Sequence, residues 1–240
     1  MVQKSGGIVL LAIFVIGTIC CLISTPQTIV PVFSSVRSRG NTLVIDAGHG
    51  GEDGGAVSHS GVPESSINLA ISLKLDQLLG FYGEVPVLLR WDDRSLHDSS
   101  ANTLHEKKVS DLHNRVELVN SIEQAVLLSI HQNTYPESKY HGAQVFYGKK
   151  EGSDSFASLT QTILCKTLDP SNTRQAKPIP ESVYLMKHVT CTAILVECGF
   201  LSNPEEDLLL QTEDYQKKLA SALAASWIQY LCSNGGGEAN

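Results

Sequence analysis

The chain has 240 residues, of which 42% are apolar, so it is long enough for one well-packed domain and little else. Its net charge is −7. Residues 1–40 carry Lys4, Arg37 and Arg39 and no acidic residue, so the remainder has 15 basic and 25 acidic residues, a net charge of −10. A nucleic-acid-binding protein needs a basic face that neutralises phosphates. The charge distribution therefore excludes nucleic acid as the expected partner.

The N-terminal 25 residues are expected to direct the chain out of the cytoplasm. Residues 8–23 form an uncharged run that Lys4 precedes and Ser24, Thr25 and Pro26 follow. With its uncharged flank, the run approaches the roughly 20 residues of a membrane span. A cleaved signal peptide has the same layout, although no A-x-A-like cleavage site follows. Either reading predicts an exported protein, which is membrane-anchored if the segment stays and secreted if it is removed.

The six cysteines do not form a pattern typical of disulfides. Cys20 and Cys21 lie in the apolar run, and Cys191 and Cys198 bracket a single expected strand. At about 3.3 Å per residue, the Cα atoms of that second pair are roughly 23 Å apart, whereas a disulfide needs less than about 7 Å. Cys198 follows Glu197, but the two side chains of such neighbours on a strand face opposite ways, and free Cys is usually buried. We expect Cys198 to be a buried thiol.

From residue 41 onward, apolar strands alternate with helical patterns. Strands are expected at 42–47, 85–90, 125–131, 142–147 and 192–197, with a further short one near 182–186. Helices are expected at 64–79, 108–123, 154–168 and 213–232. This alternation predicts an α/β fold, a doubly wound and largely parallel sheet with helices on both faces. The single catalytic domain then spans 41–233, between a linker at 26–40 and a disordered tail at 234–240.

Three of the expected strands run directly into residues that can bind or assist a metal ion. His49 follows the first strand, His131 ends the 125–131 strand and Glu197 ends the 192–197 strand, while Glu64 opens a helix. Ligands of open α/β sheets bind at the carboxyl ends of the strands. Two His and two Glu gathered at one rim are typical of a catalytic zinc site with an open fourth position. The glycine-rich turn 48–55 lacks the Gly-Lys-Ser/Thr ending of a phosphate-binding loop.

Several sequence blocks together resemble the zinc-dependent N-acetylmuramoyl-L-alanine amidases of the amidase-3 family. The blocks lie at 44–51, 64–69, 129–133, 142–147 and 195–203. The resemblance covers residues 42 to about 230. Within the family, the chain is most similar to the germination-specific amidases that act on the spore cortex, through His97-Asp98, residues 107–115 and residues 172–178.

The resemblance implies a zinc hydrolase of peptidoglycan. It assigns His49, Glu64 and His131 as ligands of one Zn²⁺ and Glu197 as the catalytic carboxylate. Glu197 would act as general base and then general acid. The bond cut would be the amide between the lactyl group of N-acetylmuramic acid and L-alanine. Asn133, Arg115 and Lys177 are weaker candidates for substrate contacts, and for Arg115 an ion pair on a helix is the competing interpretation.

Two other functional classes share these residues. A zinc peptidase that cuts within the stem peptide would use the same ligands, and a catalytically silent zinc-binding partner of another wall enzyme would keep the fold. We also expect no inhibitory plug over the site, because the strands and helices between Gly142 and Glu197 already occupy that stretch. Control would then come from outside the domain, for example from an exported protein that stabilises or activates the enzyme.

Overall fold

A computed structural model describes residues 40–234 as an α/β domain. Its six-stranded sheet has the order β2-β1-β3-β6-β4-β5. The strands are β1 (Thr42–Ala47), β2 (Val87–Leu88), β3 (Ala125–Asn133), β4 (Gln144–Tyr147), β5 (Lys177–Pro178) and β6 (Thr192–Phe200). Neighbouring strands run parallel except β4 and β6, which are antiparallel. The predicted α/β class and largely parallel sheet are confirmed.

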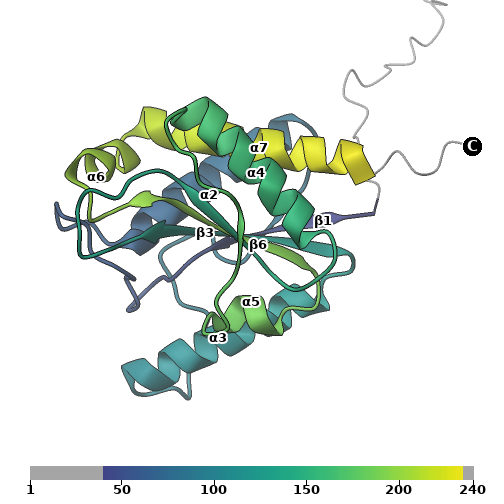
Figure 1. The fold of residues 1–240 in the computed structure, drawn as a ribbon. Helices are drawn as coiled ribbons and strands as arrows, with labels where there is room; N and C mark the ends of the chain where they lie inside the picture. The colour runs from purple at the N-terminus through teal and green to yellow at the C-terminus, as the bar shows by residue number, and fades with distance from the viewer. Residues whose placement is uncertain (1–39, 235–240) are drawn as a thin grey trace, which may run out of the picture. The chain divides into compact units, whose positions relative to one another are not determined.

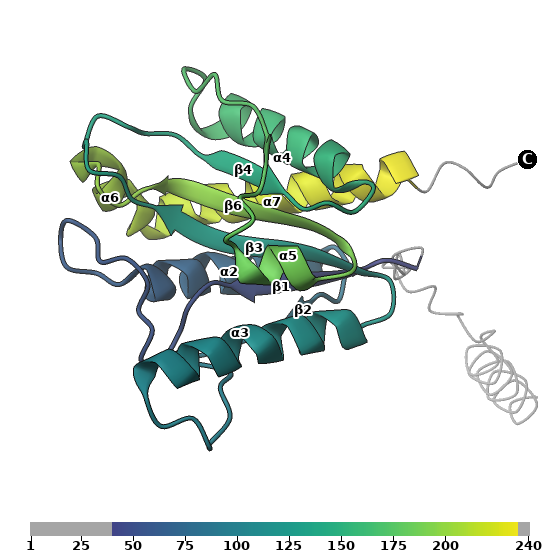
Figure 2. The same cartoon turned by 60° about the horizontal axis from the view of Figure 1, so that its bottom comes forward.

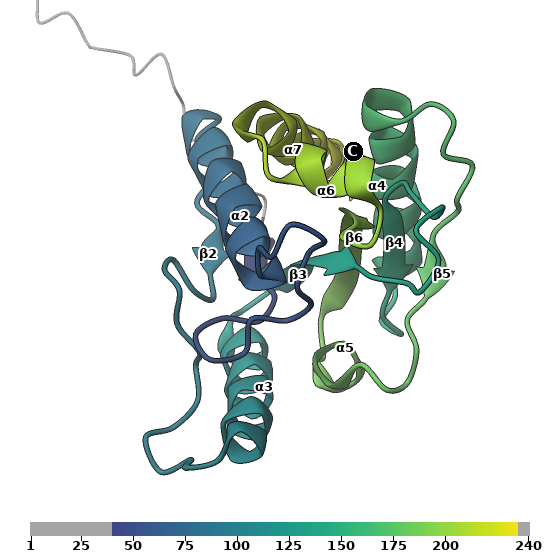
Figure 3. The ribbon, with the colours of Figure 1, turned by 90° about the vertical axis from the view of Figure 1, so that its left-hand side faces the viewer.

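Helices cover both faces of the sheet (Figures 1 and 2). They are α2 (Glu64–Phe81), α3 (Leu104–Ser121), α4 (Ser153–Leu168), α5 (Tyr184–His188), α6 (Pro204–Leu210) and α7 (Glu213–Asn234). Figure 3 shows α2, α4 and α7 on one side of the sheet, and α3 and α5 on the other. The doubly wound arrangement follows from strands that are apolar on both faces.

Two apolar cores result from this layering. Ile45, Leu128 and Val196 point to the face that α2, α4 and α7 cover, where Phe156 and Trp227 are fully buried. Their neighbours Val44, Leu127 and Leu195 point to the opposite face, toward α3 and α5. The alternation of side chains along each strand explains why adjacent residues belong to different cores. The central strands are thereby fixed, and with them the residues that follow their ends.

The structure corrects several expected elements. The apolar run at 182–186 is not a strand but the start of α5, and such a short run does not distinguish a strand from a buried helical turn. The expected strand at 85–90 is reduced to β2. α3 begins at Leu104 rather than 108, because Thr103 and Glu106 form a capping box. β5 and α6 were not expected from the sequence.

The expected N-terminal anchor or signal, and nearly all of the expected linker and tail, lie outside residues 40–234. Within that range no helix combines the length and the apolar character that crossing a membrane requires. The four cysteines of the described range are all free, and Cys198 is buried. Burial raises the pKa of the Cys198 thiol far above its ordinary value, so this side chain is an apolar core residue.

Candidate metal centre and active site

The three predicted metal ligands meet at the carboxyl ends of the central strands. His49 lies in the loop after β1, Glu64 is the first residue of α2, and His131 lies near the end of β3. One ligand atom from each residue can be chosen so that all lie within 4.8 Å of one another. The carboxylate of Glu64 is almost completely buried, whereas both imidazoles are about one-fifth exposed. The group therefore opens to solvent on its histidine side.

The carboxylate of Glu64 occupies the centre of this group. Its Oε1 lies 3.0 Å from His131 Nδ1 and accepts a hydrogen bond from the backbone N–H of Gln132. Its Oε2 lies 3.4 Å from His49 Nε2 and accepts from the backbone N–H of Ala56. Burial alone would raise the pKa of Glu64, but the contact with His131 and the charges of both histidines outweigh it and lower the pKa to about 2. Glu64 is thus an anion held between two imidazoles.

Asp53 fixes the orientation of His49. Its Oδ2 lies 3.0 Å from His49 Nδ1, and its Oδ1 accepts from the backbone N–H of Gly55. The contact with His49 is the main cause that lowers the pKa of Asp53. A carboxylate that accepts from Nδ1 leaves Nε2 free for a metal, which is the usual outer-shell arrangement of histidine ligands. Asp53 was not predicted from the sequence, because an acidic residue in a glycine-rich turn has no periodic signal.

Two glycines allow the ligands to approach one another. A Cβ atom on Gly48 would lie 2.2 Å from the imidazole of His131. A Cβ atom on Gly55 would lie 2.6 Å from Glu64 Oε2 and 2.6 Å from the ring of His49, and Gly55 has a φ of +70°. Only glycine satisfies both the close contact and the positive φ at this position.

Two buried arginines hold the backbone of the His49 loop. The guanidinium of Arg90 donates to the carbonyls of Ala47 (2.8 Å), Gly48 (3.1 Å) and Ser65 (2.7 Å). Arg115 donates to the carbonyl of His49 at 2.8 Å and to that of Ala47 at 3.1 Å. His49 itself has a φ of +62°, which is uncommon for a residue other than glycine. The arginines therefore oppose relaxation of a strained ligand-bearing turn.

Arg115 is consequently not available for the predicted substrate contact. Its side chain is 2% exposed and pairs with Asp46 and with Asp111, whose Oδ2 lies 2.7 Å from Arg115 Nε. Desolvation opposes its charge, but Asp46 and Asp111 outweigh it and raise the pKa of Arg115. Arg115 therefore forms ion pairs, as the alternative interpretation from the sequence expected. These ion pairs are buried beneath the metal group and do not lie on the helix surface.

The other two predicted substrate residues, Asn133 and Lys177, differ in how near they lie to the metal group. Asn133 ends β3, two residues after His131, and its backbone carbonyl accepts from Leu201 N at 2.8 Å. Lys177 is exposed on the edge strand β5, two strands beyond β6. Asn133 thus stays at the rim of the metal group, while Lys177 does not.

Glu197 lies beside the metal group on the neighbouring strand. It pairs in register with His131 across β3 and β6. Its Oε2 is buried and has no hydrogen-bond partner within the described part of the chain. Burial, with the nearby charge of Glu64, raises the pKa of Glu197 to about 7. A carboxyl group with such a pKa can both take and return a proton at neutral pH.

The two imidazoles and the Glu64 carboxylate fit a zinc ion, since they are typical zinc ligands and their atoms are close enough to share one ion. The partnerless oxygen of Glu197 gives independent support, because a buried polar atom without a partner is costly unless something else occupies the space beside it. Three protein ligands with a free position are typical of catalytic rather than structural zinc.

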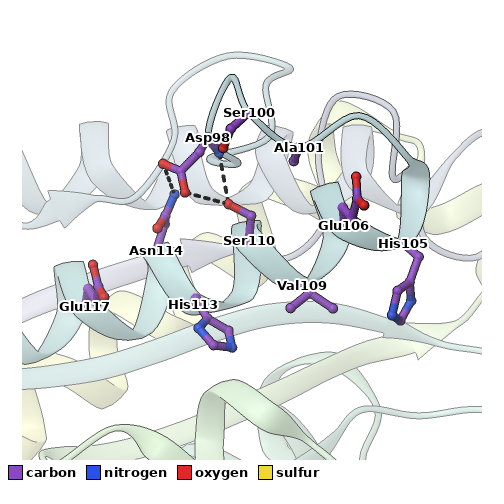
Figure 4. Close-up of a pocket in the computed structure, with 10 residues that line it drawn as sticks. All are labelled: Asp98, Ser100, Ala101, His105, Glu106, Val109, Ser110, His113, Asn114 and Glu117. Carbon is purple, nitrogen blue, oxygen red and sulfur yellow. Dashed lines mark hydrogen bonds between the residues drawn. The ribbon is translucent and has the colours of Figure 1, made fainter.

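A hollow that is separate from the metal group lies along the outer surface of α3 (Figure 4). It has a volume of about 680 Å³. In Figure 4, Asp98 contacts Ser110 and Asn114, which fasten the preceding loop to the helix. His105 and His113 line it, but neither belongs to the His-Glu-His group. The hollow thus forms where the 91–103 loop packs against α3, and it does not include the metal group.

The α/β fold, with a group that can hold a metal ion beside a buried carboxylate, is typical of a metal-dependent hydrolase, and comparison with known proteins identifies its family. Residues 43–229 match the N-acetylmuramoyl-L-alanine amidase family model. The chain belongs to this family and is a peptidoglycan amidase.

Individual relatives are similar over most of their length. The germination-specific N-acetylmuramoyl-L-alanine amidase of Bacillus subtilis is 36% identical over 202 residues, 84% of each chain. The CwlD amidase of Clostridioides difficile, solved in complex with the GerS lipoprotein, is 39% identical with a TM-score of 0.77, covering 80% of this chain and 99% of that one. The catalytic domain of CwlV from Bacillus (Paenibacillus) polymyxa is 30% identical with a TM-score of 0.66, covering 80% and 98%.

Proposed function

We propose that the chain is an exported, zinc-dependent amidase that removes stem peptides from spore-cortex peptidoglycan. The bond cleaved is the amide between the lactyl group of N-acetylmuramic acid and L-alanine. The observation that carries the proposal is the partnerless Oε2 of Glu197 beside His49, Glu64 and His131. The similarity to a germination-specific amidase supports the cortex as the substrate.

In this proposal, His49, Glu64 and His131 hold the metal, and Asp53 keeps Nε2 of His49 directed at it. When bound there, zinc supplies a Lewis acid that polarises the scissile carbonyl and lowers the pKa of the attacking water. Glu197 accepts the proton of that water and delivers it to the departing amine of L-alanine. Without a metal, burial raises the pKa of Glu197 to about 7, and the positive charge of a bound metal would lower this pKa and favour the carboxylate that accepts the proton.

The test is mass spectrometry of purified peptidoglycan incubated with the protein, with and without a chelator. We expect free stem peptides that begin with L-alanine, and glycan chains that have lost them, only when metal is present. Products cut within the stem peptide would instead indicate a zinc peptidase, and no release at all would indicate a catalytically silent partner. Equal release from vegetative wall and from spore cortex would contradict the cortex preference.

We further propose that an exported protein partner stabilises or activates the domain. The CwlD amidase of Clostridioides difficile, which is 39% identical, was solved with a lipoprotein, and this supports a partner outside the cytoplasm. Membrane attachment through residues 1–25 belongs to the same proposal. Cell fractionation, followed by N-terminal sequencing of the mature protein, distinguishes an anchor from a cleaved signal.

A further inference from the structure

A second hollow lies between the loop after β3 and the connection that follows α4. Its volume is about 370 Å³. The lining residues are Lys139, Tyr140, His141, Ser171, Asn172, Thr173 and Arg174. Lys139 and Arg174 bring positive charge to this lining, whereas the neighbouring Asp169 pairs with His141 at 3.1 Å, in a domain whose sequence beyond residue 40 carries a net charge of −10. Basic groups that gather in one hollow of an acidic domain favour an anionic ligand.

Arg174 is held in a fixed position within this hollow. Its guanidinium lies 5.1 Å from the centre of the Phe200 ring, and its Nη2 donates to the carbonyl of His141 at 3.3 Å. Its backbone N–H donates to Asn172 Oδ1, and Asn172 Nδ2 donates to the carbonyl of Ala143 at 2.8 Å. The position of Arg174 is therefore fixed by the segment that leads into β4. An arginine held in this way can bind a carboxylate through its remaining N–H groups.

Both walls of the hollow are fastened to the end of β6. Glu206 accepts hydrogen bonds from the backbone N–H groups of Gly142 (2.9 Å) and Phe200 (2.8 Å). The ring of Tyr140 lies 6.3 Å from that of Phe200, centre to centre. Glu197 precedes Phe200 by three residues on the same strand, which corresponds to roughly 10 Å. Gln144, which follows the 139–141 segment, pairs in register with Glu197, so the hollow lies at the same end of the sheet as the catalytic carboxylate.

That spacing matches an extended peptide. An extended chain spans about 3.3–3.6 Å per residue, so a group two or three residues beyond the scissile amide lies roughly 10 Å from it. Stem peptides of peptidoglycan carry free carboxylates within that distance. We propose that the hollow between residues 139–141 and 171–174 is a subsite that binds a stem-peptide carboxylate through Arg174 and Lys139. The proposal rests on the proposed function and names the part of the substrate that this surface recognises.

The experiment uses zinc-loaded protein and two forms of one peptidoglycan preparation, native and with its stem-peptide carboxylates amidated. We expect the native form to have an apparent KM about five- to tenfold lower, with similar kcat. Arg174→Gln should abolish that difference by raising KM on the native form alone, Lys139→Gln should reduce it, and Arg174→Lys should restore part of it. Lys218→Gln, which removes an exposed charge on α7, serves as the matched control.

The possible failures are distinguishable. Wild-type protein that cleaves both forms with equal KM contradicts the subsite and leaves the amidase proposal intact. A difference in KM that survives Arg174→Gln, or that Lys218→Gln abolishes equally, also contradicts the subsite. No cleavage of either form by zinc-loaded protein contradicts the proposed function itself. Metal content and melting temperature of each variant show whether a change in KM arises from unfolding.

Discussion

The Glu197 carboxylate differs from the other acidic groups of the site, because one of its oxygens has no partner in the described structure. Glu64 accepts hydrogen bonds at both oxygens, and Asp53 is engaged by His49 and Gly55. Glu197 is therefore the acidic group whose environment leaves it free to exchange a proton.

Glu197→Gln should retain metal and lose at least about 10²-fold in kcat, the usual scale for removal of a general base. The amide keeps the shape of the side chain but cannot accept the proton. Turnover of purified peptidoglycan and elemental analysis of the same sample measure the two effects. Glu205→Gln, at an exposed position, is the control, and near-normal turnover of Glu197→Gln would assign the proton transfer to another group.

The same substitution should change the pH dependence of stability in metal-free protein. Burial raises the folded-state pKa of Glu197 from 4.5 to about 7, so folding becomes less favourable as pH rises through that interval. Glu197→Gln removes this cost and should raise the free energy of unfolding by roughly 1–3 kcal/mol at pH 8, with little change at pH 4.5. Denaturant unfolding in the presence of a chelator at both pH values measures it. An equal effect at both values would show that the carboxyl does not titrate in this interval.

Glu64 has a second interpretation, as an acidic residue that stabilises the first turn of α2. As a metal ligand, Glu64→Ala should lower the zinc content steeply, because two imidazoles alone bind zinc poorly. Asp154→Ala removes an exposed acidic residue from the first turn of α4 and controls for the helix effect. Stoichiometric metal in Glu64→Ala, with only a small loss of thermal stability, would support the helix interpretation.

At the scale of elements, the turn between β1 and α2 brings His49 and Glu64 together. Gly55→Ala should lower zinc affinity by at least tenfold, because the new Cβ would collide with Glu64 Oε2 and the His49 ring. Gly61→Ala is the matched control: its φ is +90°, but a Cβ there has no heavy atom within 4 Å. Both variants carry the strain of a positive φ, and only Gly55→Ala adds the collision. Competition with a chromogenic chelator measures the affinity, and equal losses would assign the effect to strain alone.

Much of this layout could be predicted from the sequence because the central strands are apolar on both faces and end in the site residues. The α/β class and the family were predicted correctly on that basis. The roles of Asp53 and Arg90 could not be predicted from the sequence, because their contacts depend on how an irregular loop folds back on itself. The 182–186 run was assigned wrongly because five apolar-rich residues fit a strand and a helical turn equally.

At the scale of the whole molecule, residues 148–190 form α4, β5, α5 and their connections. α4 packs against α7, and α5 packs against α3. A zinc-loaded fragment that starts at residue 41 should therefore cleave peptidoglycan without activating proteolysis. Release of stem peptides before and after limited proteolysis measures this. An inert fragment that trimming within 148–190 switches on would reveal an inhibitory segment, and an inert fragment that fails to hold zinc would favour a stabilising partner.

The direction of β1 also determines how an attached segment would affect access to substrate. The strand enters the sheet at Thr42 and delivers His49 only after six residues of extended chain, a distance of roughly 20 Å. The chain that precedes Thr42 therefore joins the domain at the amino ends of the central parallel strands, whereas the catalytic rim lies at their carboxyl ends. The metal group and Glu197 lie at the opposite ends of these strands, so a segment attached before Thr42 would leave the entrance of the site open to a polymer as large as peptidoglycan.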